Sequence, residues 1–233
     1  MKNIHKFIPP CPDPDKYVLV KGEFGYYWRR IRGTVNPAKL NPMMTEFAGN
    51  MKECMSSAGE LVNKLQPYTE NFHHSHNTQR FAAGLNKALV SRGKMNYSYF
   101  DGMEIHKKYP IATVMSTQWE IKEKKKMFSV HNRIRPGIVD PLRNRSLTHF
   151  CFELILVSGD PANPVKLRTE SDRSDMYEIK PDRRTGISNE SICSLSVLLP
   201  DKKPFMVLFK VAGYEKNFLS GSSHHAMRVI RTG

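Results

Sequence analysis

The chain has 233 residues, of which 39% are hydrophobic, and it carries a formal net charge of +14. This hydrophobic fraction excludes a disordered chain, and the length allows one large domain or two small ones. The positive charge favours an anionic partner such as nucleic acid, an acidic protein surface or lipid headgroups. Ordinary solubility is the alternative, because the excess is spread evenly: residues 1–100 and residues 101–233 each carry +7.

From the N-terminal residues we expect neither a secretory signal nor a membrane-spanning segment. Lys2 and Lys6 lie near the start, but no apolar stretch follows them, and Pro9, Pro10, Pro12 and Pro14 come directly after. The proline-rich residues 8–16 favour an extended, polyproline-like conformation. We therefore expect synthesis in the cytoplasm, with export in an assembled particle as an open alternative.

The segment 24–35 has the alternation of a β-strand and combines aromatic with basic side chains. Aromatic rings stack on nucleic-acid bases and arginines neutralise phosphates, so this segment is a candidate for binding nucleic acid or a protein partner. The residues of this candidate are Tyr27, Trp28, Arg29, Arg30 and Arg32. The alternative is an amphipathic edge strand with its aromatics packed inward and its arginines outward.

The same segment carries a resemblance to a known family. Its residues are Gly22-x-x-Gly25-Tyr26-x-Trp28-Arg29-x-Ile31-Arg32, followed by Pro37-Ala38-x-Leu40 and a helix that contains Phe47. This run resembles the opening of an uncharacterised family of basic Bacteroidetes proteins over about the first forty residues, without that family's Gln-Arg before the aromatic. The resemblance implies a β-rich C-terminal half and a bacterial or prophage-type origin, but no activity, cofactor or site residue.

Two helices are predicted after this segment. The first begins near Pro37 or Asn41 and ends at Leu65, before Pro67, and its apolar stripe is Leu40, Met44, Phe47, Met51, Cys54, Ala58, Leu61 and Leu65. The second has a stripe of Phe81, Leu85, Ala88 and Leu89, with Asn77 or Ser75 as its cap and Gly93 at its end. The Met-rich stripe, formed by Met43, Met44, Met51 and Met55, suits an adaptable protein contact, although core packing is the favoured interpretation.

After residue 100 the pattern changes to short alternating runs separated by turn residues. Strands are predicted over 111–122, 127–130, 147–157, 165–169, 176–179, 191–199, 205–212 and 226–231, with 200–204 as a hairpin connection. The fold class is therefore α+β: an N-terminal strand and helical hairpin over 1–100, and an antiparallel β-sandwich over 101–233, immunoglobulin-like or jelly-roll.

A second basic segment lies within 122–145, where long loops interrupt the strands. Its candidate residues for nucleic-acid or partner binding are Lys124, Lys125, Lys126, Arg133, Arg135, Arg143 and Arg145.

A weak metal candidate lies on the strand predicted over 147–157. His149, Cys151 and Glu153 alternate onto one strand face, and two ligands at this spacing can share a metal ion. A packed, hydrogen-bonded sheet face is the competing interpretation, because no second ligand cluster lies at an obvious register on a neighbouring strand. We therefore expect no metal and no cofactor.

The sequence contains no nucleophile elbow, phosphate-binding loop or dinucleotide-binding turn. We expect a protein without enzymatic activity and without an evident small-molecule substrate. The favoured hypothesis is a structural or protein-interaction module, such as a subunit of a phage or injection-type particle that binds another protein or assembles with itself. The alternative is a nucleic-acid-binding protein that uses segments 26–32 and 122–145.

Overall fold

The computed structural model describes residues 10–11, 13–22, 25–31, 42–70, 72, 76–114, 119–134, 147–179, 191–215 and 218–233. The chain divides into a first unit over Met1–Thr45 and a second unit over Glu46–Gly233. The boundary between the two units therefore falls after residue 45, whereas the sequence analysis expects a domain boundary at residue 100. The helical residues from Glu46 onward and the sheets belong to one unit.

The first unit contains a single strand pair in its described part. Strands β1 (Tyr17–Gly22) and β2 (Gly25–Arg30) pair antiparallel, from Tyr17 opposite Arg30 to Gly22 opposite Gly25. The strand predicted over 24–35 is present as β2 with β1 as its partner, while residues 24 and 32–35 lie outside the described residues.

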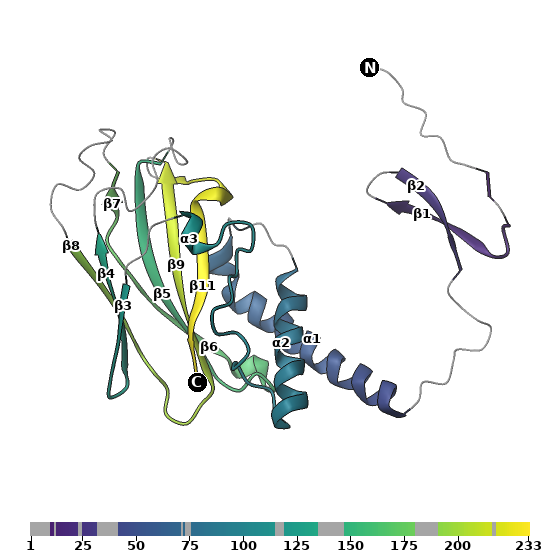
Figure 1. Cartoon of the computed structure of the whole chain (residues 1–233), viewed down its shortest axis with the longest axis horizontal. Coiled ribbons are helices and arrows are strands. Elements are labelled where there is room, and N and C mark those ends of the chain that lie inside the picture. Colours follow the sequence, from purple (N-terminus) through teal and green to yellow (C-terminus); the bar gives the residue numbers. More distant parts are fainter. Residues whose placement is uncertain are drawn as a thin grey trace, which may run out of the picture. The chain divides into compact units, whose positions relative to one another are not determined.

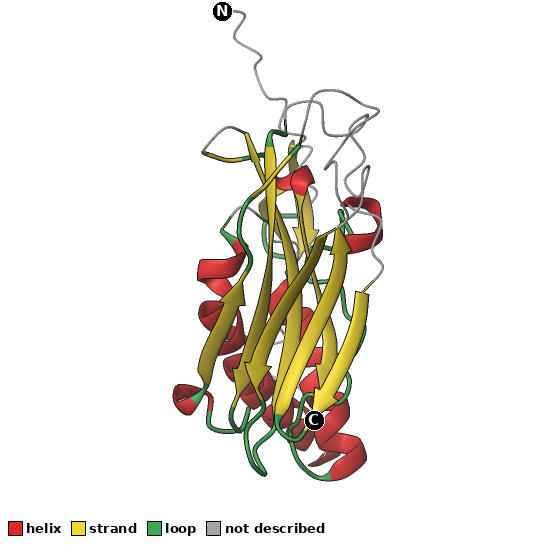
Figure 2. Ribbon diagram, turned by 90° about the vertical axis from the view of Figure 1, so that its left-hand side faces the viewer, coloured by secondary structure: helices red, strands yellow, loops and turns green. Residues whose placement is uncertain are grey.

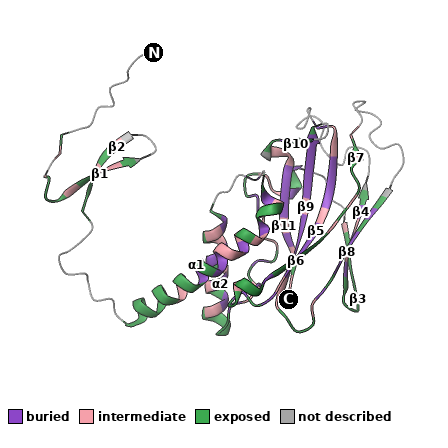
Figure 3. Cartoon of the chain, turned by 180° about the vertical axis from the view of Figure 1, so that it is seen from behind, coloured by how far each residue is buried: buried purple, intermediate pink, exposed green. Residues whose placement is uncertain are grey.

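Helix α1 spans Pro42–Thr69, and its apolar stripe is buried only in its second half (Figure 3). Cys54, Ala58 and Leu61 are fully buried, whereas Met44 and Phe47 are 58% and 53% exposed. Core packing, the favoured interpretation of the Met-rich stripe, is therefore wrong for Met44, because the first turns of α1 extend past the core residues that cover the later turns. Leu40 lies outside the described residues. The predicted stop at Pro67 was also wrong, since a proline in the last turn removes only one backbone hydrogen bond.

Helix α2 spans Asn77–Arg92 and ends as predicted. Gly93 adopts a left-handed conformation with φ of 69°, and its N–H donates to the Leu89 carbonyl at 2.8 Å. The start differs from the prediction: His76 precedes the helix without a side-chain capping bond, and the Asn77 amide oxygen instead accepts from Arg80 at 3.2 Å. Ser75 lies outside the described residues.

The second unit has two antiparallel sheets (Figures 1 and 2). In the larger sheet, β9 lies between β5 on one side and β11 with β10 on the other, and β5 also pairs with β6 and β7. The smaller sheet has the order β3-β4-β8. The strands are β3 (Trp119–Lys124), β4 (Met127–Ile134), β5 (His149–Ser158), β6 (Arg168–Arg173), β7 (Tyr177–Glu178), β8 (Ser191–Leu198), β9 (Phe205–Glu215), β10 (Phe218–Leu219) and β11 (His225–Thr232).

The predicted α+β class with a sandwich is confirmed, and the structure adds that the helices cover the outer face of the larger sheet (Figure 1). Alternate residues of β5 enter two different cores. Phe150, Phe152 and Leu154 pack against the smaller sheet, whereas Ile155 and Val157 pack against α1 and α2. Burial on both faces explains why this strand is a nearly continuous apolar run in the sequence.

Two predicted local structures were wrong. Ile111–Val114 forms a short helix, α3, and β3 begins only at Trp119. Residues 200–204 are not a hairpin connection: β8 pairs with β4 and β9 pairs with β5, so this segment joins the two sheets. Adjacent strands with a short polar connection are typical of a hairpin, but pairing partners are chosen by core contacts distant in sequence.

The outer edge of β11 is covered by residues 102–105, whose backbone bonds include Gly102 N–H to the Val229 carbonyl at 2.9 Å. This covering protects the edge from pairing with other chains. Among the described residues, no helix combines the length and the apolar character needed to cross a lipid bilayer.

A buried histidine beside this edge makes stability depend on pH. His225 is 1% exposed, its Nε2 contacts the Ser220 carbonyl at 3.0 Å, and its own carbonyl accepts from His106 Nδ1 at 2.8 Å. Burial, with smaller effects of Lys210, His224 and His106, lowers the pKa of His225 to about 4.

The neutral ring of His225 therefore stabilises the fold above its ordinary pKa of 6.5, and this contribution is lost as the pH falls toward 4. We expect the free energy of unfolding to fall by about 1 kcal/mol per pH unit in this window from this group alone. Urea denaturation at several pH values measures the slope. The variant His225→Gln retains a donor for Ser220 but cannot titrate, so an equal slope in this variant contradicts the assignment.

Candidate functional site

The strand pair of the first unit places the predicted binding residues on two faces. Residues opposite each other in an antiparallel pair share a face, and the faces alternate along each strand. One face holds Val18, Val20, Tyr27 and Arg29; the other holds Tyr17, Leu19, Lys21, Tyr26, Trp28 and Arg30. Each face therefore combines aromatic, aliphatic and cationic side chains, and no polar face exists.

None of the side chains described in this strand pair is buried. Tyr27 is 49% exposed, Val18 is 43% exposed and Ile31, directly after β2, is 46% exposed. An isolated two-stranded hairpin is only marginally stable in water, because it has no covered apolar face. The predicted alternative, an edge strand with its aromatics packed inward, does not describe Tyr27.

The arginines of the hairpin point to opposite faces. Arg29 and Arg30 are exposed, and among the described residues neither has a carboxylate within 4 Å, whereas Lys16 pairs with Asp13 at 2.8 Å. Arg32 lies outside the described residues. The hairpin thus offers one exposed guanidinium per face next to an aromatic ring.

The second predicted binding segment is not gathered into one patch. Lys125 and Lys126 form the turn between β3 and β4, directly after Lys124, and Lys126 pairs with Asp201. Arg133 lies at the opposite end of β4, roughly 20 Å away at the rise of a β-strand. Arg135, Arg143 and Arg145 lie outside the described residues. In the described part of the chain, this segment therefore forms a basic turn at residues 124–126 and a separate exposed arginine, Arg133.

The weak metal candidates lie on the face of β5 that also carries Ile155 and Val157. The Glu153 carboxylate accepts from Lys210 at 3.1 Å, and Cys151 is buried against Ala212 and Tyr214. His149 Nδ1 contacts the Thr148 hydroxyl at 2.9 Å. Within the described residues, no group of three or more His, Cys, Asp or Glu side chains is arranged to hold a metal ion. This face is the hydrogen-bonded sheet face of the competing interpretation.

Two further residues, Arg173 and Tyr214, belong to this face, and the sequence pattern did not indicate them. Arg173 on β6 donates to the Tyr214 hydroxyl at 2.6 Å, and this hydroxyl lies 3.8 Å from Cys151 Sγ. Burial, with the neighbouring Cys151, raises the pKa of Tyr214 to about 12, so its hydroxyl stays protonated at neutral pH. The arrangement joins three strands by hydrogen bonds and offers no activated nucleophile or base.

The start of α1 is a second exposed apolar feature. Met43 is 77% exposed and Phe47 is 53% exposed, one helical turn apart. Large apolar side chains grouped on an exposed helix face are typical of contacts with another protein.

Comparison of the chain with known protein families, with characterised proteins and with solved structures found no match.

Proposed function

We propose that this protein is a non-catalytic assembly subunit whose β1–β2 hairpin pairs with a second protein chain, in the first instance another copy of itself. The observation that carries this proposal is a strand pair rich in aromatic residues in which no described side chain is buried. A partner strand or apolar surface would supply the burial that the hairpin lacks.

The two-stranded form of this sheet supports the same proposal, because among the described strands β1 and β2 pair only with each other. A two-stranded sheet has two edges, and an edge with free backbone N–H and C=O groups is a template for pairing with another strand. Two hairpins related by a two-fold axis would form a four-stranded sheet, which is the simplest closed, symmetric assembly.

Trp28 is a built-in reporter for this proposal, because the chain has only two tryptophans and the other is Trp119. In the variant Trp119→Phe, we expect the Trp28 emission to shift to shorter wavelength as the protein concentration rises from micromolar to hundreds of micromolar. Burial of the ring in a partner contact is the reason. Sedimentation velocity on the same samples measures the mass.

The matched control is Trp28→Phe, in which Trp119 remains as the only tryptophan. Trp119 packs against Phe209 at 4.8 Å between ring centroids, so its emission should not change with concentration. A monomer with constant Trp28 emission over the whole range contradicts the proposal.

A second candidate function is nucleic-acid binding, and the exposed Arg29 and Arg30 beside Tyr27 favour it. The same reporter separates the two functions, since a base stacked on the hairpin would quench Trp28 at low salt without a change of oligomeric state. Binding of this kind should weaken steeply as salt rises. An oligonucleotide that leaves the Trp28 emission unchanged at low salt excludes this use of the hairpin.

A further inference from the structure

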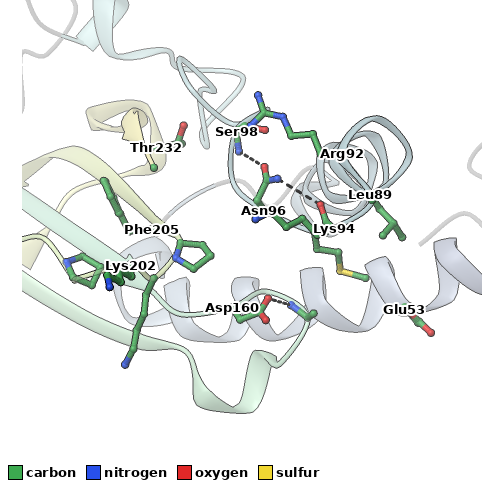
Figure 4. Close-up of a pocket in the computed structure, with 17 residues that line it drawn as sticks. Glu53, Leu89, Arg92, Lys94, Asn96, Ser98, Asp160, Lys202, Phe205 and Thr232 are labelled. Carbon is green, nitrogen blue, oxygen red and sulfur yellow. Dashed lines mark hydrogen bonds between the residues drawn. The ribbon is translucent and has the colours of Figure 1, made fainter.

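A pocket of about 870 Å³ lies in the second unit, remote in sequence from the hairpin (Figure 4). Pockets of roughly 300–1,000 Å³ are typical of small-molecule sites. Its walls come from the end of α2 and the turn after it, the loop at 160–162, the connection at 200–205 and the last residues of β11. No function assigned above uses it.

Four cationic side chains line this pocket from two separate segments. Arg92 and Lys94 come from the end of α2, and Lys202 and Lys203 from the connection between the two sheets. All four are exposed, and among the described residues none has a carboxylate within 4 Å. Cations that line one concave surface add to a common positive field.

The acidic residues of the lining do not cancel this charge. The lining contains Glu53 and Asp160 against the four cations. Asp160 Oδ1 accepts from the Ala162 N–H at 2.9 Å and stabilises its own turn. The pocket therefore keeps an excess of positive charge that suits a ligand with more than one negative charge.

The remaining lining is largely apolar. Its apolar residues are Leu89, Met95, Ala162, Pro200, Pro204 and Phe205. Figure 4 shows Phe205 and Lys202 on the side of the pocket opposite Leu89 and Arg92. A flat apolar group can rest on Phe205 and the prolines while an anionic group reaches the cations.

We propose that this pocket binds a small anionic ligand that carries a flat apolar group, the chemistry of a nucleotide. The guanidinium of Arg92 is suited to bind two phosphate oxygens at once, and the lysines act as point charges along a chain of phosphates. Phe205, Pro200 and Pro204 supply the apolar surface for the base. This binding is independent of the pairing proposed for the hairpin.

The test uses the full chain and a fluorescent N-methylanthraniloyl derivative of ATP as the probe. We expect saturable binding of one probe per chain that unlabelled ATP reverses. The variant Arg92→Gln/Lys202→Gln should weaken binding at least about tenfold, because it removes charge-assisted contacts from both walls. These side chains are exposed, so the variant should keep the circular dichroism spectrum of the wild type.

The matched control is Lys107→Gln/Lys166→Gln, which removes the same charge from two exposed lysines outside the pocket lining. This variant should bind like the wild type. Absence of saturable binding at low salt, or an equal loss in both variants, overturns the proposal. Competition by adenosine as strong as by ATP overturns the anionic part, and competition by tripolyphosphate as strong as by ATP overturns the apolar part.

Discussion

Replacing Gly84 with alanine should lower the free energy of unfolding by about 2 kcal/mol and the melting temperature by roughly 5 °C. Gly84 lies in α2, and a Cβ atom there would be only 2.1 Å from Cε1 of Phe100. Phe100 is 1% exposed and packs edge-to-face on Phe81 at 5.2 Å, so its ring has little room to move. Thermal and urea denaturation of Gly84→Ala measure the effect.

Gly59→Ala in α1 is the matched control for this prediction. A Cβ at residue 59 meets nothing within 4 Å, so the higher helix propensity of alanine should raise stability by about 0.5–1 kcal/mol. Gly84→Ala should lower the free energy of unfolding and Gly59→Ala should raise it. This difference in sign separates the steric clash with Phe100 from the effect of helix propensity. Equal stability of Gly84→Ala and wild type would mean that α2 does not approach Phe100 this closely.

Replacing Glu153 with alanine should destabilise the fold by about 3 kcal/mol. Glu153 and Lys210 pair at 3.1 Å on the central strands, and their side chains are only 13% and 12% exposed. The variant leaves the Lys210 ammonium in this poorly hydrated place without its carboxylate, and the Tyr68 ring at 5.9 Å compensates only in part. Urea denaturation at neutral pH measures the loss.

Two further variants test whether burial is the cause. Glu153→Leu/Lys210→Met removes both charges and should recover most of the lost stability. Glu120→Ala breaks an exposed pair with Lys122, at 3.3 Å with side chains 68% and 57% exposed, and should cost less than about 1 kcal/mol. If Glu153→Ala lowers the free energy of unfolding no more than Glu120→Ala does, the Glu153–Lys210 pair does not stabilise the fold.

Local patterns predicted those parts of the fold that depend on neighbouring residues. The 3-4 spacing from Cys54 to Leu65 gave the buried face of α1, and Gly93 gave the end of α2 because a left-handed residue is required there. The same spacing did not reveal that Phe47 stays exposed, since the periodicity shows which side chains share a face and not what covers it.

Only part of the candidate site follows from the sequence. The alternation of aromatics and arginines over 26–32 predicts a strand with Tyr27 and Arg29 on one face, and the structure agrees. Its lack of burial is not visible in the sequence, because an exposed and a covered strand have the same pattern. The pocket was not predicted at all, since Arg92 and Lys202 are more than a hundred positions apart.

By itself, therefore, the sequence determined the α+β class, the two main helices and the doubly buried strand β5, which depend on side-chain period and turn residues over short distances. The tertiary structure alone decided that β8 pairs with β4 and β9 with β5, and that Glu153 meets Lys210. It also decided that two lysines of the connection at 200–204 line the same pocket as the end of α2. The physical reason is that strand pairing and convergence are selected by the free energy of the whole packed core, to which residues distant in sequence contribute together.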